Sequence, residues 1–403
     1  MLQFEHNDDS SANILVVGIG GGGGNAVNRM IKAGLNGITY IAINTDKQAL
    51  ETSSADTKLQ IGDKVTGGLG AGGDPQKGTE AAEESIEDIK RFMTGVNMVF
   101  ITAGMGGGTG TGGAPVIAKV AKDMGILTVG VVTKPFTFEG KKRGDQANLG
   151  ISYLKKYVDS LVVVPNDKLM LIADEHTTVP QAFDMADEVL KQGVEGISTI
   201  ISETATINLD FADVRTIMKD RGIAHMGIGE GEGDSKVEDA VKDAIESPLL
   251  ETSIDGAKAI ILNVSGGNDL GMLEVTKAAD QIEQAADKDA IVIFGVGIKE
   301  DLEDKLKITV IATGFEDRSV DAVDDNPGFG LTEEKYDSPD VEDIVSPADE
   351  RSEEEKLDDT LPDFGNFSES DENEPEQENL LSAEQEKNVL DHDFTIPGFL
   401  KKE

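Results

Sequence analysis

Two glycine-rich segments, each lying between a run of apolar residues and a helical pattern, limit the folds open to this chain. The first covers residues 18–25 and follows the apolar residues 14–18, which predict a buried strand. The second covers residues 104–113 and follows a similar apolar run at 98–103. Glycine lets backbone N–H groups come close to a phosphate, and the N-terminus of a helix attracts an anion. Both segments are therefore predicted to bind phosphate.

The first segment alone leaves two kinds of nucleotide open. Gly18, Gly20 and Gly23 satisfy the G-x-G-x-x-G fingerprint of NAD-binding proteins, and Asp46 follows at the spacing used there for the ribose. A dinucleotide-binding domain has one phosphate loop, so the second segment favours a triphosphate held from both ends, with Thr109 adding a hydroxyl. The pattern G-x-x-x-x-G-K-S/T does not occur, which excludes a P-loop NTPase. An NAD-dependent oxidoreductase stays the alternative.

Strands and helices are predicted to alternate along the first 180 residues. Strands that are apolar throughout and separated by helices indicate a mostly parallel sheet covered on both faces. We therefore expect an α/β fold with a Rossmann-like domain. Pro115 is expected in the first turn of its helix, where proline is tolerated. The further strands are expected at 38–44, 126–132 and 161–164, and the helices at about 25–33, 78–92 and from 114 onward.

A long helical pattern separates this region from a second one. Residues 179–201 carry apolar side chains at helical spacing, and a helix of that length spans about 33 Å. We expect it to form a central helix between two domains. The second region is predicted to be an α+β domain, with strands near 224–228, 257–264, 291–296 and 308–312 and helices near 236–245 and 271–285.

Charge is concentrated at the end of the chain. The net charge is −41, and the last 88 residues, with 7 basic and 30 acidic side chains, hold more than half of it. Because that stretch has few large apolar residues, it cannot offset its ordering entropy, and we expect a disordered acidic C-terminal tail. A chain this acidic is not expected to bind nucleic acid.

Composition also narrows the chemistry. There is no cysteine, which excludes disulfides, thiolate zinc sites and a cysteine nucleophile, and the four histidines are scattered, so no metal site is predicted. No apolar run is long enough to span a membrane, and the first residues lack the pattern of a secretory signal. We therefore expect a cytoplasmic protein.

The second glycine segment also carries a family signature. Residues 106–112 read Gly-Gly-Gly-Thr-Gly-Thr-Gly, and the chain resembles the tubulin/FtsZ superfamily over about 13–315 and at the extreme C-terminus. The resemblance implies a GTPase that uses GTP and Mg²⁺, with an optional monovalent cation. Further matching stretches lie in order at 44–46, 68–72, 133–136, 138–143, 165–169 and 208–215. The implied parts are a disordered N-terminal tail at 1–12, a GTP-binding domain at 13–178, a central helix at 179–202, an activation domain at 203–315, an acidic linker at 316–386 and an adaptor-binding peptide at 387–403.

The resemblance also assigns the nucleotide contacts. It implies that Glu139 and Arg143 contact the ribose or phosphates, and that Asn166, Phe183 and Asp187 contact the base. A carboxylate at Asp187 can accept both the ring N–H and the amino group of guanine, which adenine does not offer. Read without the resemblance, Phe183 is a core residue. The implied nucleotide-binding set is Gly21, Gly22, Gly23, Gly24, Asn25, Asn44, Asp46, Ala71, Gly72, Gly107, Gly108, Thr109, Gly110, Thr133, Glu139, Arg143, Asn166, Phe183 and Asp187.

A small polar group, Asn208, Asp210 and Asp213, allows two interpretations. Position alone predicts that Asp210 caps a helix beginning near Phe211, with Asp213 favourable in its first turn. The resemblance implies that all three act in trans, orienting water in the nucleotide site of the next subunit. Such head-to-tail contacts do not close on themselves and generate filaments. The implied role is a homopolymer that builds the division ring at midcell.

The C-terminal peptide is expected to bind partners. Ile396, Pro397, Phe399 and Leu400 resemble the segment through which the family binds membrane-tethering division adaptors such as FtsA. Spatial regulators of division are further implied partners. Two other functions stay open: a scaffold that binds GTP for assembly without hydrolysing it, and a relative that never forms filaments.

Overall fold

The computed structural model describes residues 12–171, 173–174, 176–202, 210–247, 254, 256–299 and 302–315. The expected linker and C-terminal peptide, including Ile396, Pro397, Phe399 and Leu400, lie outside the described residues. Asn208 and residues 1–11 of the expected N-terminal tail lie outside them as well.

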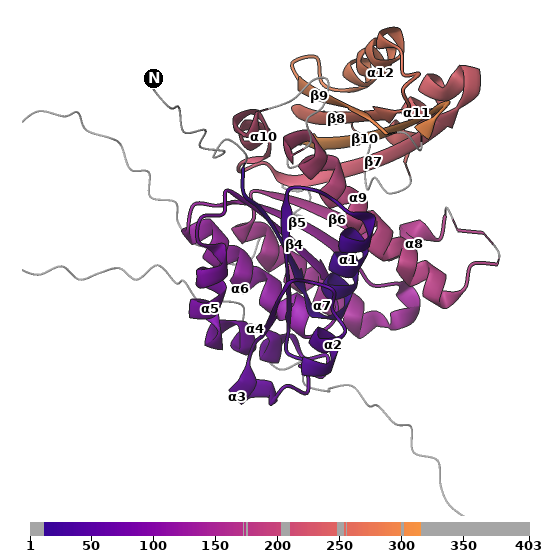
Figure 1. Cartoon of the computed structure of the whole chain (residues 1–403). Helices are drawn as coiled ribbons and strands as arrows, with labels where there is room; N and C mark the ends of the chain where they lie inside the picture. The colour runs from indigo at the N-terminus through magenta and orange to yellow at the C-terminus, as the bar shows by residue number, and fades with distance from the viewer. Residues whose placement is uncertain are drawn as a thin grey trace, which may run out of the picture. The chain divides into compact units, whose positions relative to one another are not determined.

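Ten strands form one sheet in the described part of the chain (Figure 1). They are β1 (Ile14–Ile19), β2 (Ile38–Asn44), β3 (Thr57–Gln60), β4 (Met98–Gly104), β5 (Leu127–Lys134), β6 (Ser160–Pro165), β7 (Gly222–Glu232), β8 (Ala259–Gly266), β9 (Ile291–Ile298) and β10 (Lys305–Thr313). Their order is β3-β2-β1-β4-β5-β6-β7-β10-β8-β9. Neighbours from β3 to β7 are parallel, β10 runs antiparallel to β7 and β8, and β9 is parallel to β8. The predicted mostly parallel sheet is confirmed.

Helices connect most of the parallel strands. They are α1 (Gly20–Ala33), α2 (Lys47–Glu51), α3 (Asp63–Thr66), α4 (Pro75–Glu84), α5 (Ile86–Met93), α6 (Thr109–Asp123), α7 (Lys141–Tyr157), α8 (Asn166–Leu169), α9 (Val179–Ser202), α10 (Phe211–Met218), α11 (Lys236–Ile245) and α12 (Met272–Ala285). Short 3₁₀ turns lie at Thr137–Glu139 and Gly233–Ser235. The single helix expected over 78–92 is two helices, which meet at Ser85.

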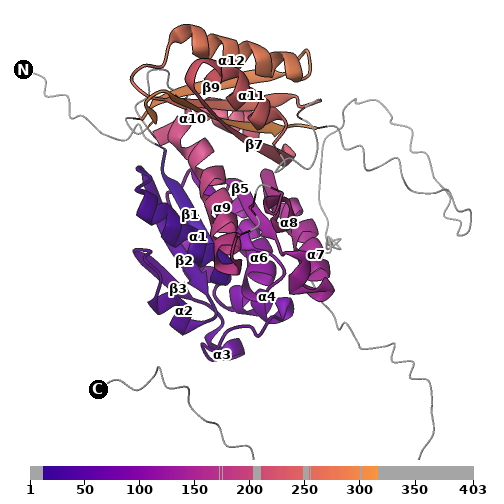
Figure 2. The same ribbon diagram turned by 90° about the vertical axis from the view of Figure 1, so that its right-hand side faces the viewer.

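The parallel strands are buried on both faces, because successive side chains point to opposite sides of the sheet. Ile14 and Val16 of β1 join one core cluster with α1, α9 and α10. Leu15 and Val17 join a second cluster with α4, α5, α6 and α7. Figure 2 shows α1 and α9 on one side of this sheet and α4, α6 and α7 behind it.

The helices after the glycine segments begin earlier than predicted. α1 begins at Gly20 rather than near residue 25, and α6 begins at Thr109 rather than near residue 114. Pro115 therefore lies inside α6, where it cannot donate an intrahelical hydrogen bond. Tertiary packing outweighs this cost: α6 is buried along most of its length, and α4 lies so close that a Cβ on Gly112 would be 1.9 Å from the carbonyl oxygen of Pro75.

The predicted central helix is confirmed as α9, whose 24 residues span about 36 Å. Its buried residues Val189, Leu190, Val194 and Ile197 belong to the same cluster as Ile311 of β10, so α9 packs against both parts of the sheet.

The second region is the predicted α+β unit, built from β7 to β10 with α11 and α12 around a third core cluster. Glycines in β7 let α11 lie directly on the strand. A Cβ on Gly227 would be 2.0 Å from the carbonyl oxygen of Ala244, and a Cβ on Gly229 would be 1.9 Å from that of Ala240. β7 also pairs with β6, so both regions share one sheet.

Candidate nucleotide site

The two glycine segments meet at the carboxyl ends of β1 and β4, which are neighbours in the sheet. The strand order 3-2-1-4-5-6 changes direction at β1, and α/β proteins bind ligands outside the sheet at such a point. A Cβ on Gly20 would lie 3.1 Å from the amide nitrogen of Gly110, and one on Gly22 would lie 3.2 Å from that of Gly104. The structure thus brings together the two predicted phosphate-binding segments.

The helix N-termini at this point carry no side-chain cap. Among the described residues, no side chain caps the first turn of α1 or α6, whereas Asp46 caps α2 and Asp74 caps α4. Ideal Cβ positions on Gly21, Gly24 and Gly107 meet no atom within 4 Å, so their backbone faces open space. Free N–H groups and the helix dipole favour an anion at both ends.

The loop after β2 supports the same edge. Thr45 and Thr109 share a hydrogen bond of 2.7 Å between their hydroxyl oxygens, and Asn44 beside Thr45 is buried. Asp46 accepts hydrogen bonds from the amides of Gln48 and Ala49, so it holds the loop in shape.

The loop at residues 67–74, between α3 and α4, packs against the second glycine segment. A Cβ on Gly108 would lie 2.7 Å from Cβ of Ala71, which shows how closely this loop approaches α6. Gly72 is exposed, with φ of +63° and no atom within 4 Å of its Cβ position. Its backbone is therefore open to a ligand.

The segment after β5 forms the next wall. The amide of Met105 donates to the carbonyl of Thr133, which ties β5 to the second glycine segment. Glu139 accepts a hydrogen bond from the amide of Phe136 and pairs with Arg143 of α7. A Cβ on Gly106 would lie 2.8 Å from the carbonyl oxygen of Arg143, so the first turn of α7 stands beside the glycine segment.

Aromatic side chains gather where this wall meets α9. Phe183 contacts Phe136 and Phe138 edge-to-face, with ring centroids 5.4 and 6.3 Å apart. Phe183 is 41% exposed, so it is not the core residue that its spacing alone predicts. Such a ring can stack on a base.

Two polar side chains near these aromatic rings are at least partly buried, and the free-energy cost of their burial is not fully offset. Asn166, at the start of α8, is buried, and its Oδ1 accepts no hydrogen bond from the residues that the structure describes. Asp187 lines a cavity of about 560 Å³ between α1 and α9, together with Asn25. Burial raises the pKa of Asp187 to about 6, while Arg29 lowers it and Asp184 raises it. An unpaired buried acceptor costs free energy unless a ligand satisfies it.

Asp210 and Asp213 lie elsewhere. Asp210 caps α10 by accepting a hydrogen bond from the amide of Ala212, which confirms the predicted cap, and Asp213 is exposed in the first turn. The hydroxyl of Ser160 donates to the carbonyl of Met218, so α10 ends at the amino end of β6. Figures 1 and 2 show α10 at the opposite end of the sheet from α2 and α3, away from the glycine segments.

The comparisons with known proteins agree with this geometry. The profile of the Tubulin/FtsZ family, GTPase domain, matches residues 13–174, and that of the FtsZ family, C-terminal domain, matches residues 222–316. The solved FtsZ dimer of M. jannaschii is 44% identical, with a TM-score of 0.74 over 76% of this chain and 89% of that one. The chain belongs to the tubulin/FtsZ family. It is a GTPase of that family, which confirms the resemblance seen in the sequence.

The fold is shared more widely within the tubulin/FtsZ family. CetZ2 of Haloferax volcanii is 22% identical, with a TM-score of 0.64 over 76% of this chain and 94% of that one. CetZ1 of the same organism is also 22% identical, with a TM-score of 0.65. At this identity the likeness shows the fold alone.

Two features of the site escaped the sequence reasoning. Thr45 joins the β2 loop to α6, and Arg29 lines the cavity beside Asp187. Arg29 follows Asn25 by four residues, so helical spacing placed it on the same face.

Within the described residues there is no cluster of three acidic or histidine side chains suited to a metal ion, and no helix long and apolar enough to cross a membrane.

Proposed function

We propose that this protein is a GTP-dependent polymerising cytoskeletal protein of bacterial cell division, which forms head-to-tail filaments that build the division ring. One observation carries the proposal. Asp210 and Asp213 lie at the opposite end of the sheet from the uncapped glycine segments, so a chain cannot bring them to its own nucleotide. A second copy stacked in the same orientation supplies them.

The nucleotide is held by parts of one subunit. The backbone of Gly21–Asn25 and Gly107–Gly110 binds the phosphates, since both helix N-termini are open there. Glu139 and Arg143 contact the ribose side. Asn166 donates or accepts at the base, Phe183 stacks on it, and Asp187 accepts from guanine.

Hydrolysis then needs the neighbouring subunit. Asn208, Asp210 and Asp213 of the next copy orient the attacking water, because phosphoryl transfer depends on positioning and electrostatics. Mg²⁺ would be held mainly by the phosphates, with Thr109 near its waters, which fits a site without a carboxylate cluster among the described residues. The ion would neutralise charge that develops on the phosphates.

A solved relative supports assembly. The M. jannaschii FtsZ, which is 44% identical, was solved as a dimer. By the same family relation, Ile396, Pro397, Phe399 and Leu400 of each tail bind membrane-tethering adaptors such as FtsA, and many tails on one filament give avidity.

The test is GTP turnover per subunit against protein concentration, followed by a mixing experiment. Turnover is expected to be negligible at low concentration and to rise above a threshold. Asp213→Ala and Asp187→Ala are each expected to be inactive alone. Mixed in equal amounts, they should recover up to about a quarter of the wild-type rate, because one random head-to-tail contact in four pairs two intact halves.

Three outcomes contradict the proposal. Turnover that is constant from the lowest concentration upward would mean that each subunit carries a complete site. Unchanged turnover in Asp213→Ala would remove the trans role of the α10 acids. Assembly with GTP but without hydrolysis in the wild-type chain would favour the non-catalytic scaffold.

A further inference from the structure

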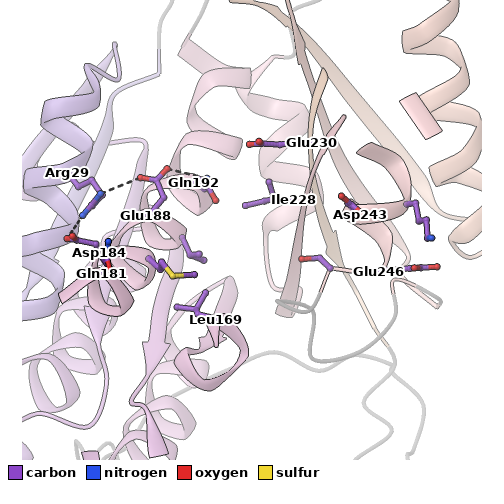
Figure 3. A pocket seen from close by; sticks show the side chains of 14 residues that line it. Arg29, Leu169, Gln181, Asp184, Glu188, Gln192, Ile228, Glu230, Asp243 and Glu246 are labelled. Atoms are coloured by element: carbon purple, nitrogen blue, oxygen red, sulfur yellow. Dashed lines mark hydrogen bonds and ion pairs between the residues drawn. The ribbon is translucent and has the colours of Figure 1, made fainter. Parts of the chain in front are cut away.

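Arg29 of α1 stands between two cavities. One guanidinium nitrogen lies 2.5 Å from Oδ1 of Asp184, and another lies 3.9 Å from Oε2 of Glu188, so Arg29 ties α1 to α9 (Figure 3). These three residues line the cavity of about 560 Å³ that also contains Asn25 and Asp187. They also line a larger cavity of about 850 Å³ on the other side.

Charged groups of both signs surround Asp187. Those that line its cavity are Asp184, Glu188 and Lys191 on α9 and Arg29 and Lys32 on α1. Lys191 is held by Glu188 at 2.7 Å and lies 3.9 Å from Glu195. Beyond Arg29, the far wall of the larger cavity adds Glu230, Asp243 and Glu246, with Lys242 as its cation (Figure 3).

Helix geometry places Arg29 where it acts on Asp187. Asp187 and Glu188 lie three and four residues after Asp184, so both neighbour Asp184 on the surface of α9. Arg29 pairs with Asp184 and approaches Glu188, on either side of Asp187 along the helix. The Arg29 side chain is one-third exposed, so solvent screens its charge only in part at this point.

We propose that Arg29 is a positioning residue of the nucleotide site, which offsets the acidic groups around Asp187 and keeps the Asp187 carboxylate charged and facing the base. This inference rests on the proposed function, in which Asp187 accepts the ring N–H and amino group of guanine. A neutral carboxyl group would present a donor to those donors, so guanine recognition depends on the charge that Arg29 supports.

The experiment measures GDP affinity of the full chain from pH 5 to pH 8 by calorimetry. The variants are Arg29→Gln, Arg29→Lys and Asp187→Asn, with Arg91→Gln as the control. Arg91 pairs with Asp88 on the exposed surface of α5, so its loss removes one positive charge far from the site. A nucleotide's terminal phosphate also titrates near pH 6. The Asp187→Asn profile records that contribution and is subtracted.

In the subtracted profile, Arg29→Gln is expected to move the midpoint of affinity loss upward by about half to one pH unit. Binding should therefore weaken about three- to tenfold at pH 5 and less than about twofold at pH 7. Arg29→Lys should restore most of the midpoint, and Arg91→Gln should match the wild type. An unchanged midpoint, or equal weakening at every pH, overturns the role of Arg29. If instead the wild type does not bind GDP, or Asp187→Asn binds it as tightly, the proposed function itself fails.

Discussion

At the scale of single residues, the candidate site is marked by groups whose burial is not fully compensated. Asn166 keeps an unpaired acceptor, and burial raises the pKa of Asp187 to about 6. Both costs are removed if a base donates hydrogen bonds to these groups. Only the packing of α1, α8 and α9 shows how far these two side chains are buried.

Asp187 is expected to lower the stability of the nucleotide-free protein and to strengthen the binding of GDP. Its raised pKa means that the stability it contributes is fully present below its ordinary value of 3.8 and is lost as the pH rises through about 6. Asp187→Asn is therefore expected to raise the melting temperature of the nucleotide-free protein at pH 7.5. It should also weaken GDP binding about tenfold or more, since hydrogen bonds to a charged group are lost. Calorimetry checks both, and a lower melting temperature would contradict the argument.

At the scale of elements, one close backbone contact and one helix cap help to fix the positions of two helices. α11 lies on β7 because Gly227 and Gly229 have no side chains. α10 begins at a cap, Asp210, which the proposed mechanism also uses. Each contact makes a prediction that separates packing or capping from other effects.

Gly229→Ala should destabilise the protein by roughly 3 kcal/mol or more, because the new Cβ would overlap the carbonyl oxygen of Ala240. Gly144→Ala is the matched control. Gly144 lies inside α7, and its Cβ position meets no atom within 4 Å, so the change should stabilise by about 0.5–1 kcal/mol. Urea unfolding measures both, and similar values for the two variants would contradict the close contact.

Asp210→Ser should separate the two roles of Asp210. Serine caps helices about as well as aspartate, so the unfolding free energy should change by less than about 0.5 kcal/mol. The carboxylate is lost, and GTP turnover above the assembly threshold should fall strongly. If turnover stays near wild type while Asp210→Ala is unstable, Asp210 is a cap and nothing more.

At the scale of the described molecule, α9 connects the nucleotide site to the second region. Its first turns carry Phe183 and Asp187, and further along Glu195 pairs at 2.6 Å with Lys299, which follows β9. Burial raises the pKa of Glu195, but the hydrogen bond and charge of Lys299, with Lys191 and Lys307, lower it overall. This pair is therefore expected to stabilise the contact between α9 and the second region.

Glu195→Gln should lower the unfolding free energy at pH 7 by about 1–3 kcal/mol, since it removes the carboxylate charge that attracts Lys299 and Lys191. A lowered folded pKa gives stability that is present above the ordinary value of 4.5 and is lost as the pH falls through the lower folded value. The variant should therefore lose less stability than wild type on acidification. Glu87→Gln, in an exposed pair with Lys90, should change stability by no more than about 0.5 kcal/mol.

Local sequence patterns were enough to predict many of the strands and helices of this protein, and its family. Apolar runs predicted the strands at 38–44 and 98–103, and apolar side chains at helical spacing predicted the long helix α9, because hydrophobic periodicity is a local property. The glycine signature, with its two phosphate segments, identified the family.

Other features were decided only by the tertiary structure. Burial against α4 extended α6 backward through its glycines despite Pro115. Contacts between residues more than 150 positions apart placed Arg29 beside Asp184, and the sheet set Asp210 at the far end from the nucleotide. Such features depend on what surrounds a residue, and a linear pattern does not contain that environment.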